Sequence, residues 1–444
     1  MSQARICIDG YNLSLPRGTG IATYGRNLLS SFSQIGVSGE ALYGTLTKRT
    51  NDERIDESRI AANDDRDRTM ARFSFFWRTA SSRLGRTAYP IRPAPNTVWP
   101  SGRRPQADRL WLSPSLYRLG NRCYSRYGAE TGVKFRASID HPAPSVMHWT
   151  SPLPIYAQSV PNIYTFHDLI QLRFPELTSG NPKRYAELCN TVLKRADHIS
   201  VVSETTRREL IDILGVPWER ITNTYQAVDI PDAVVSSTPD DVEAVLDAAF
   251  NLHWKGYYLH FGAIEPKKNL GRIVEAYVAS GVRTPLVIVG APAWMSEGET
   301  ALLERIAREG GDQASRIKRY EYLPLHLLLP LIKGARAVVF PSLYEGFGLP
   351  VLEAMTLGTA VLTSTAGSLP EIVGTAAFLV DPYDVNSIAR GFRAIDGDDS
   401  LREGLERGGV VRAADFSTTA YKARLVELYS KVGVDIKSSS ETKA

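Results

Sequence analysis

The chain has 444 residues, of which 43% are hydrophobic, and this length is enough for two domains with buried cores. The formal net charge is only +4, and the three cysteines (Cys7, Cys123 and Cys189) are too far apart for a zinc or disulfide framework, which favours an intracellular, reduced protein. No apolar run approaches the ~20 residues of a membrane-spanning helix, and the first residues lack a secretory signal.

The amino-terminal half opens with a strand pattern at 4–10, a glycine loop and then a helix. Apolar residues from Ile21 to Phe32 recur at helical spacing. Further strand patterns lie at 145–149, 162–169 and 198–203, with helical stretches between them. This alternation predicts a parallel sheet that is covered on both faces.

A segment from about 48 to 140 is rich in proline, arginine and aromatic residues and shows no clear periodicity. From Thr69 to Arg136 there are thirteen Lys and Arg against two acids, Asp108 and Glu130. We interpret the segment as an irregular, basic aromatic insertion. Three roles stay open for it: a disordered surface loop, a nucleic-acid surface, although no recognition module is visible, or docking on an anionic membrane or a lipid-diphosphate acceptor.

The carboxy-terminal half repeats the alternation after a linker at 229–244. Its strand patterns lie at 257–264, 285–290, 337–342 and 360–364, and its helical patterns at 269–280, 298–309, 350–358 and 369–374. We therefore expect an α/β fold with two Rossmann-like domains, 1–232 and 233–425, whose parallel sheets face each other across a cleft. Residues 426–444 are expected to form the end of a helix and a polar tail.

The stretch FPSLYEGFGLPVLEAM (340–355) carries the strongest functional pattern. Gly346 and Gly348 let the backbone turn tightly and approach a ligand. The following helix begins at a proline, and its free N–H groups favour an anion such as phosphate. Glu345 and Glu353 flank this pocket, and carboxylates accept hydrogen bonds from sugar hydroxyls. The pattern therefore predicts a site for a nucleotide-sugar.

The motif EGFGLPVLEAM resembles the E-x7-E signature of retaining glycosyltransferases with two Rossmann-like domains, particularly glycosyltransferase family 4. Other segments that resemble this family, or its mannosyltransferase-like branch, are GAIEPKKNLGRIVEAY (262–277), GSLPEIVGTAAFLVDPYDVNSIA (367–389), TFHDL (165–169) and VSETTRREL (202–210). The likeness covers about residues 4–35 and 145–430, and it leaves the basic segment outside.

The resemblance implies the GT-B fold and a set of site residues. Glu353 would hold the donor ribose and Glu345 the donor hexose, while Lys268, with Lys267, would neutralise the leaving diphosphate. His167 would line the reaction centre, and the implied catalytic residues are His167, Glu345 and Lys268. The remaining implied donor contacts are Gly18, Thr19 and Gly20 of the amino-terminal loop, and Gly346, Phe347, Gly348, Leu349 and Pro350 of the motif.

The implied reaction moves a hexose from a nucleoside diphosphate to an acceptor hydroxyl, without a metal or another cofactor. A phosphate oxygen of the donor would take the acceptor proton. Many relatives have arginine where this chain has Ala263 and Lys267, so Lys268 is the firmer diphosphate ligand. The D-x-D patterns at 65–67 and 396–398 follow no apolar strand and predict no metal site.

The branch implies a hexosyltransferase of bacterial surface polysaccharide (lipopolysaccharide) synthesis, with GDP-mannose as the expected donor and a saccharide or lipid-linked acceptor. Rhamnose, glucose or GlcNAc donors stay open, as do a nucleotide-sugar 2-epimerase of the same fold and a non-catalytic sugar-nucleotide-binding subunit. We expect a cytoplasmic enzyme that can be peripheral on the cytoplasmic face of the inner membrane and that does not bind nucleic acid.

Overall fold

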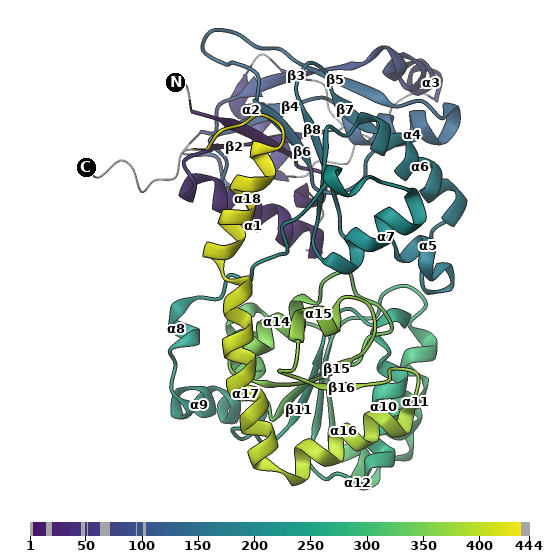
Figure 1. Ribbon diagram of the computed structural model, residues 1–444, viewed down its shortest axis with the longest axis vertical. Helices are drawn as coiled ribbons and strands as arrows, with labels where there is room; N and C mark the ends of the chain where they lie inside the picture. The colour runs from purple at the N-terminus through teal and green to yellow at the C-terminus, as the bar shows by residue number, and fades with distance from the viewer. Residues whose placement is uncertain are drawn as a thin grey trace, which may run out of the picture.

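The computed structural model describes residues 3–14, 20–45, 49–50, 52–62, 72–94, 96–100 and 104–436. These residues form two α/β units, each built on its own sheet and placed one above the other (Figure 1). The expected pair of α/β units with parallel-dominated sheets is confirmed, while the domain boundary at 232 and 233 stays a prediction. Among the described residues, none of the helices combines the length and the apolar character needed to cross a bilayer.

The amino-terminal sheet has, within the described residues, the strand order β10-β9-β8-β6-β1-β2-β4-β3-β5-β7. Its pairs are parallel except β3 with β4. The strands are β1 (Arg5–Asp9), β2 (Ser38–Tyr43), β3 (Arg86–Ile91), β4 (Arg109–Leu112), β5 (Thr131–Phe135), β6 (Val146–Trp149), β7 (Ile155–Ala157), β8 (Asn162–Phe166), β9 (His198–Val201) and β10 (Ile221–Asn223). The central strands β6, β8 and β9 are buried along their whole length, because helices cover both faces of the sheet.

The helices of this unit begin and end at residues suited to those positions. The side chain of Asn181 caps the start of α6, and that of Ser203 caps α7, which ends at the left-handed Gly215. The helices are α1 (Gly20–Gln34), α2 (Glu53–Ala62), α3 (Arg72–Ser81), α4 (Leu116–Tyr127), α5 (Ile170–Arg173), α6 (Pro182–Arg195) and α7 (Glu204–Leu214), with the 3-10 turns η1 (Asn12–Ser14), η2 (Ser82–Leu84), η3 (Pro175–Leu177) and η4 (Trp218–Arg220).

The basic segment at 48–140 is a correction to the sequence interpretation, because its described residues are not irregular. They supply α2, α3, α4 and three strands, β3, β4 and β5, that extend the sheet. Trp111 of β4 is completely buried, and its indole N–H donates to Glu40 at 2.6 Å. Short strands broken by proline and arginine carry too few residues to show a period, so the pattern was missed.

The carboxy-terminal sheet has, within the described residues, six parallel strands in the order β13-β12-β11-β14-β15-β16. They are β11 (Tyr258–Phe261), β12 (Leu286–Val289), β13 (Ile317–Tyr320), β14 (Ala337–Phe340), β15 (Ala360–Ser364) and β16 (Phe378–Val380). The helices are α8 (Asp232–Val235), α9 (Pro239–Phe250), α10 (Leu270–Ser280), α11 (Glu297–Glu309), α12 (Gly311–Ser315), α13 (Leu325–Gly334), α14 (Leu349–Thr356), α15 (Leu369–Val373), α16 (Val385–Gly397), α17 (Asp399–Ala413) and α18 (Thr418–Ser430), with η5 (Pro266–Lys268) and η6 (Ala414–Phe416).

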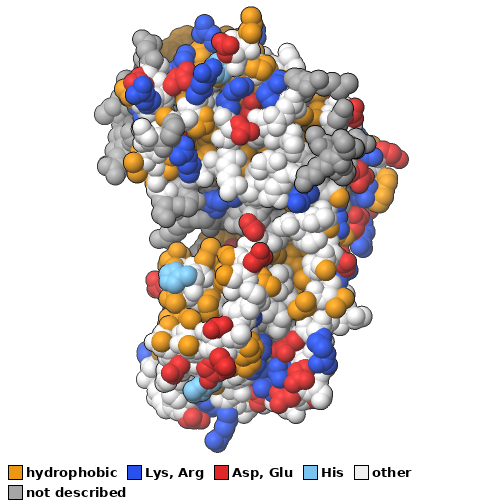
Figure 2. Space-filling view, turned by 90° about the vertical axis from the view of Figure 1, so that its left-hand side faces the viewer, with side chains coloured by type: hydrophobic (Ala, Val, Ile, Leu, Met, Phe, Trp, Pro, Cys, Tyr) orange, Lys and Arg blue, Asp and Glu red, His pale blue; other side chains and the backbone are white. Residues whose placement is uncertain are grey.

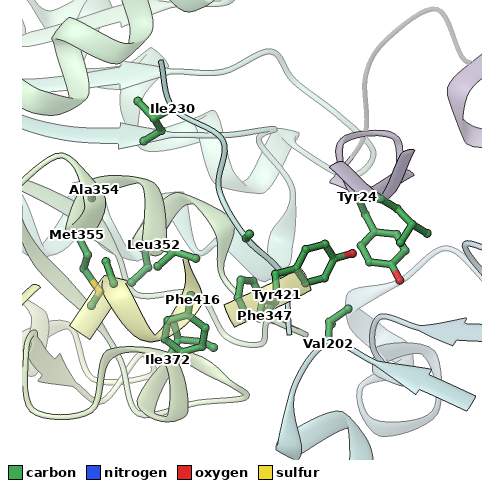
Figure 3. Packing of buried hydrophobic residues seen from close by; sticks show 14 of the residues in the cluster. Tyr24, Val202, Ile230, Phe347, Leu352, Ala354, Met355, Ile372, Phe416 and Tyr421 are labelled. Atoms are coloured by element: carbon green, nitrogen blue, oxygen red, sulfur yellow. The ribbon is translucent and has the colours of Figure 1, made fainter. Parts of the chain in front are cut away.

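Helix α18 leaves the carboxy-terminal unit and runs back along the amino-terminal one (Figure 1). Its Tyr429 hydroxyl bonds the buried His148 Nδ1 of β6 at 2.7 Å. A single buried apolar cluster includes Tyr24 of α1, Tyr421 of α18 and Phe416 of η6 (Figure 3). Because this cluster draws on both units, it fixes how they sit relative to each other.

The outer surface of the carboxy-terminal unit is divided. On the side shown in Figure 2, hydrophobic side chains gather on the part next to the junction of the two units, whereas charged side chains are concentrated towards the far end. The carboxyl ends of strands β11 and β14 lie on the junction side, since the loop after β14 contacts the amino-terminal unit. The candidate site is therefore built at this junction.

Candidate functional site

The loop between β14 and α14 holds the main motif, and its glycines are required by close approaches. A Cβ added to Gly346 would collide with the carbonyl oxygen of His167 in the amino-terminal unit. Gly348 has φ of 107° and caps the start of α14, a conformation that other residues rarely adopt. The two glycines therefore bring the loop against the opposite unit.

A second loop, after β15, packs against the backbone of the motif and forms hydrogen bonds with it. The hydroxyl of Ser368 donates to the carbonyl oxygens of Glu345 and Phe347, both at 2.9 Å. A side chain at Gly367, where φ is 59°, would strike the backbone of Glu345. Gly367 and Ser368 lie in a segment quoted for its family likeness, but nothing in the sequence assigned them this supporting role.

Glu345 and Lys268 form an ion pair at the centre of the site. Their charged atoms are 2.6 Å apart, and both side chains are almost completely buried. Burial would raise the pKa of Glu345, but the ammonium groups of Lys268 and then Lys267 outweigh it, so its pKa lies below the usual range. Glu345 is therefore ionised near neutral pH, and a fixed positive charge stands beside it.

Lys267 lies next to this pair and is surrounded by acids. Its ammonium group is 3.5 Å from Glu265. Burial would lower the pKa of Lys267, but the carboxylates of Glu345, Asp168 and Glu265 raise it above its usual value. Asp168 comes from the amino-terminal unit, so the two units share the electrostatics of this site.

Glu353 is different, because its carboxylate has no partner among the residues that the structure describes. It lies in the second turn of α14, half-buried, and makes no side-chain hydrogen bond or ion pair with any residue that the structure describes. Burial raises the pKa of Glu353 from 4.5 to about 7. An unpaired, half-buried acid is costly to the fold and is typical of a group that is completed by a ligand.

The start of α14 supplies a further set of unused groups. The backbone amides from 346 to 349 donate to no acceptor within the described part of the chain. The first helical bond accepted at this end is from Val351 N–H to Gly348 O, at 3.0 Å. Free amides and the helix dipole together favour a bound anion.

His167 lies across the junction from this loop. Its Nε2 is 2.8 Å from the carbonyl oxygen of Thr150, so Nε2 carries the proton and Nδ1 is left as an acceptor. Burial lowers the pKa of His167, against smaller opposite effects of Thr150 and Asp168, and the ring is neutral near pH 7. The ring meets Tyr24 edge-on at 4.9 Å. His148, by contrast, is fully buried between two hydroxyl groups and is structural.

The other expected donor contacts lie in the amino-terminal loop and in the motif itself. Gly20 is the first residue of α1, while Gly18 and Thr19 lie outside the described residues. Leu349 and Pro350 are half-buried at the start of α14. The ring of Phe347 is buried and contacts Phe416 (Figure 3) and Tyr225, so the ring belongs to the core and the backbone of Phe347 is what it contributes to the loop.

The second D-x-D pattern has structural uses. Asp396 accepts hydrogen bonds from Thr284 and Tyr258, and Asp398 caps the start of α17. The first pattern, at 65–67, lies outside the described residues. Asp168 and Glu265 are the charged residues at the site that sequence reasoning missed. Asp168 follows His167 directly in the quoted TFHDL, which was the available signal.

These groups form one arrangement with a clear chemical capacity. Free amides and two ammonium groups can hold a diphosphate, and Glu353 offers an unpaired carboxylate to a diol. The neutral imidazole of His167 faces the same junction from the opposite unit. Such a site can bind an anionic, hydroxyl-rich ligand and stabilise a departing phosphate group.

Two family models match the chain. The model described as "Glycosyltransferase Family 4" matches residues 87–231, and the model described as "Glycosyl transferases group 1" matches residues 251–409. The first match begins inside the basic segment. The expectation that the whole of 48–140 lies outside the family likeness was therefore wrong for its later part, which carries the strands and helix that were missed.

Curated relatives agree with these models. The O-antigen chain mannosyltransferase B of Escherichia coli is 35% identical over 272 residues, which cover 60% of this chain and 69% of that protein. The serotype-specific mannosyltransferase WbdA of E. coli is 29% identical over 298 residues, which cover 65% of this chain but only 36% of that protein. The chain thus spans about a third of the length of WbdA.

Solved structures share the fold. Sucrose-phosphate synthase from Thermosynechococcus elongatus superposes with a TM-score of 0.66 at 17% sequence identity, over 97% of this chain and 99% of that one. This coverage extends over both units and includes most of the basic segment. The expected GT-B arrangement of two facing α/β domains is confirmed.

Proposed function

Because the chain belongs to the glycosyltransferases that join a family 4 domain to a group 1 domain, and is a hexosyltransferase of that family, we propose that it is a mannosyltransferase. Its donor is a nucleoside diphosphate sugar, GDP-mannose, and its acceptor is a saccharide or a lipid-linked saccharide. The transfer is a step in the synthesis of a bacterial surface polysaccharide, and the enzyme acts in the cytoplasm. The printed names of the two E. coli relatives support mannose as the transferred sugar.

The observation that carries this proposal is the carboxylate of Glu353 in α14, which has no partner among the described residues, together with the unused amides at the start of this helix and the Lys268–Glu345 pair in the loop before it. A carboxylate without a partner suits the two hydroxyls of the donor ribose. The amides from 346 to 349 suit the diphosphate, and Glu345, held in place by Lys268, suits hydroxyls of the hexose. One nucleotide-sugar satisfies all three groups at once.

The chain's own residues supply most of what the transfer needs. As the glycosidic bond breaks, negative charge grows on the leaving diphosphate, and the ammonium groups of Lys268 and Lys267 with the free amides stabilise it. A donor phosphate oxygen takes the acceptor proton. His167 is neutral and presents Nδ1 as an acceptor, so it orients a hydroxyl of the bound sugar rather than adding charge.

A thermal-shift screen across GDP-, UDP-, dTDP- and ADP-linked sugars tests the donor. A ligand at 100 times its dissociation constant stabilises a protein by about 2.7 kcal/mol, which is readily measured. We expect GDP-mannose to give the largest shift. A larger shift with another nucleotide-sugar would contradict GDP-mannose as the donor but would still agree with a glycosyltransferase. No shift with any of these donors would contradict the proposed site.

Turnover assays test whether the reaction needs a metal and whether it needs an acceptor. We propose that the lysines and amides replace a metal, so turnover in the presence of a chelator should equal turnover in its absence. Transfer should require an added acceptor. Conversion of the donor to its 2-epimer without an acceptor would contradict the transferase and support a nucleotide-sugar epimerase instead.

A further inference from the structure

The segments at 202–210 and 367–374 lie far apart in the sequence and meet across the junction of the two units. The first contains the start of α7 in the amino-terminal unit, and the second contains α15 in the carboxy-terminal unit. Helices α7 and α15 lie on facing sides of the junction (Figure 1). Apart from Gly367 and Ser368, which support the motif loop, these segments supply no residue to the candidate site.

Glu371 of α15 makes the contact between the two segments. Its Oε1 accepts the N–H of Glu204 at 2.6 Å, and its Oε2 accepts the N–H and the hydroxyl of Thr205, both at 3.0 Å. Glu204 and Thr205 are the first two residues of α7, so their amides have no acceptor within their own helix. A carboxylate at this end also interacts favourably with the helix dipole. The carboxy-terminal unit therefore caps a helix of the amino-terminal unit.

The backbone of Glu371 is anchored in its own unit. Arg412 of α17 donates from Nη2 to the carbonyl oxygen of Glu371 at 2.6 Å, and from Nε to that of Ile372 at 2.9 Å. Ser368, directly before α15, is the residue whose hydroxyl donates to the carbonyl oxygen of Glu345. A displacement of α15 would therefore move the loop that supports Glu345.

Helix α7 also contacts residues of the candidate site. The hydroxyl of Thr206 donates to the carbonyl oxygen of His167 at 3.1 Å. Further along the helix, Glu209 accepts a hydrogen bond from the hydroxyl of Tyr344, the residue directly before Glu345. Helix α7 thus binds the carboxy-terminal unit at two points and holds His167 in the amino-terminal unit.

We propose that Glu371 is a positioning residue for the transfer reaction. By binding the start of α7, its carboxylate fixes the amino-terminal unit against the motif loop, so that His167 and the Lys268–Glu345 pair keep one arrangement around the donor. Two amides and a hydroxyl already occupy this carboxylate, so it acts through these contacts and not through the donor. The inference rests on sugar transfer at the proposed site, but not on which nucleotide-sugar is the donor.

Hydrogen exchange of the ligand-free full chain tests whether this contact forms in solution. The first amides of a helix exchange rapidly when they lack an acceptor. In the wild type the amides of Glu204 and Thr205 should be protected, and in Glu371→Ala they should exchange about 10-fold faster or more. The amide of Arg184 at the start of α6, which Asn181 caps within the amino-terminal unit, should exchange equally in both proteins.

Steady-state kinetics with GDP-mannose and a mannoside acceptor tests the effect on the reaction. A misplacement of reacting groups by about 1 Å can cost about 100-fold in rate, so Glu371→Ala should lower kcat by about 10–100-fold. The donor dissociation constant should rise about 3-fold or less, because the contacts proposed for Glu353 and the motif amides stay within one unit. Rates are measured below the melting transition of each variant and are expressed per folded molecule.

Matched variants separate the contact from general effects of the substitution. Thr205→Val removes only the hydroxyl contact and should lower kcat less than Glu371→Ala, while Thr205→Ser should restore it. In the double variant Glu371→Ala/Thr205→Val the two losses should not add, because both changes break the same contact. Glu309→Ala removes an exposed acid of α11 and should change neither exchange nor kcat.

Two results would overturn the positioning role. Unchanged exchange at Glu204 and Thr205 in Glu371→Ala would show that the contact does not form in solution. Faster exchange with an unchanged kcat would show that the contact serves only the fold. No turnover of the wild type with GDP-mannose would contradict the proposed donor instead, and the kinetic comparison would then use the nucleotide-sugar that gives the largest thermal shift.

Discussion

Replacing Glu353 by Gln tests two expectations: that the ionised carboxylate destabilises the folded protein, and that it binds the donor. In the folded protein the pKa of Glu353 is about 7, whereas its ordinary value is 4.5. The folded state holds the proton more tightly than the unfolded chain, so wild-type stability falls as pH rises from about 4.5 to about 7. Glutamine has no charge to desolvate, so the variant should escape this loss.

The size of the effect follows from the shift. A difference of about 2.5 pH units corresponds to about 3 kcal/mol, and solvent access to the half-buried carboxylate reduces this to roughly 1.5–3 kcal/mol. For domains of this size, that corresponds to a melting temperature about 3–12 °C higher for the variant at pH 8. Near pH 4.5 the two proteins should melt at nearly the same temperature.

Differential scanning fluorimetry at pH 4.5 and pH 8, with and without donor, measures both consequences. Glu353→Gln should gain stability at pH 8 and lose the donor-induced shift, while the exposed control Glu309→Gln should change neither. A variant that is less stable at pH 8, or that still shows the full donor shift, would refute the reasoning. The first result would mean that Glu353 supports the fold, and the second that it does not contact the donor.

Three further substitutions test the site and the junction. Lys268→Ala should lower kcat by about 10²–10³-fold, since it removes a preorganised donor to the leaving group, and Lys268→Arg should recover part of this loss in a steady-state assay. Gly346→Ala should weaken donor binding in a thermal-shift titration, because its Cβ would strike His167; unchanged affinity would mean that the two units tolerate separation. Tyr429→Phe should destabilise the protein by about 1–3 kcal/mol in denaturant unfolding, because it leaves the buried Nδ1 of His148 without a partner, and an unchanged midpoint would show that water replaces the hydroxyl.

Much of the carboxy-terminal unit could be predicted from the sequence. Its strands are continuous apolar runs between glycine and proline signals, and its helices repeat apolar residues at a regular spacing. The loop at 341–348 and the start of the following helix could also be predicted, because the conformational preferences of Gly346, Gly348 and Pro350 are known. The two acids of the motif, Glu345 and Glu353, were found because they flank this loop and helix start.

The amino-terminal unit was harder to predict. Strands β3, β4 and β5 are short, and β3 carries a proline, so no period was visible in the segment at 48–140. Nothing in the sequence of this segment indicated that Trp111 is buried against Phe135. Burial of an aromatic residue depends on which strand lies beside it, and that is a property of the sheet order.

The sequence by itself determined the two α/β units, the loop chemistry of the main motif and the positions of its two acids, since each rests on residues close together in the chain. Only the tertiary structure decided that Glu345 is held by Lys268 while Glu353 has no partner among the described residues, that His167 is neutral, and that α18 packs against both units. These features depend on contacts between residues far apart in the chain, and on the burial that sets their charge.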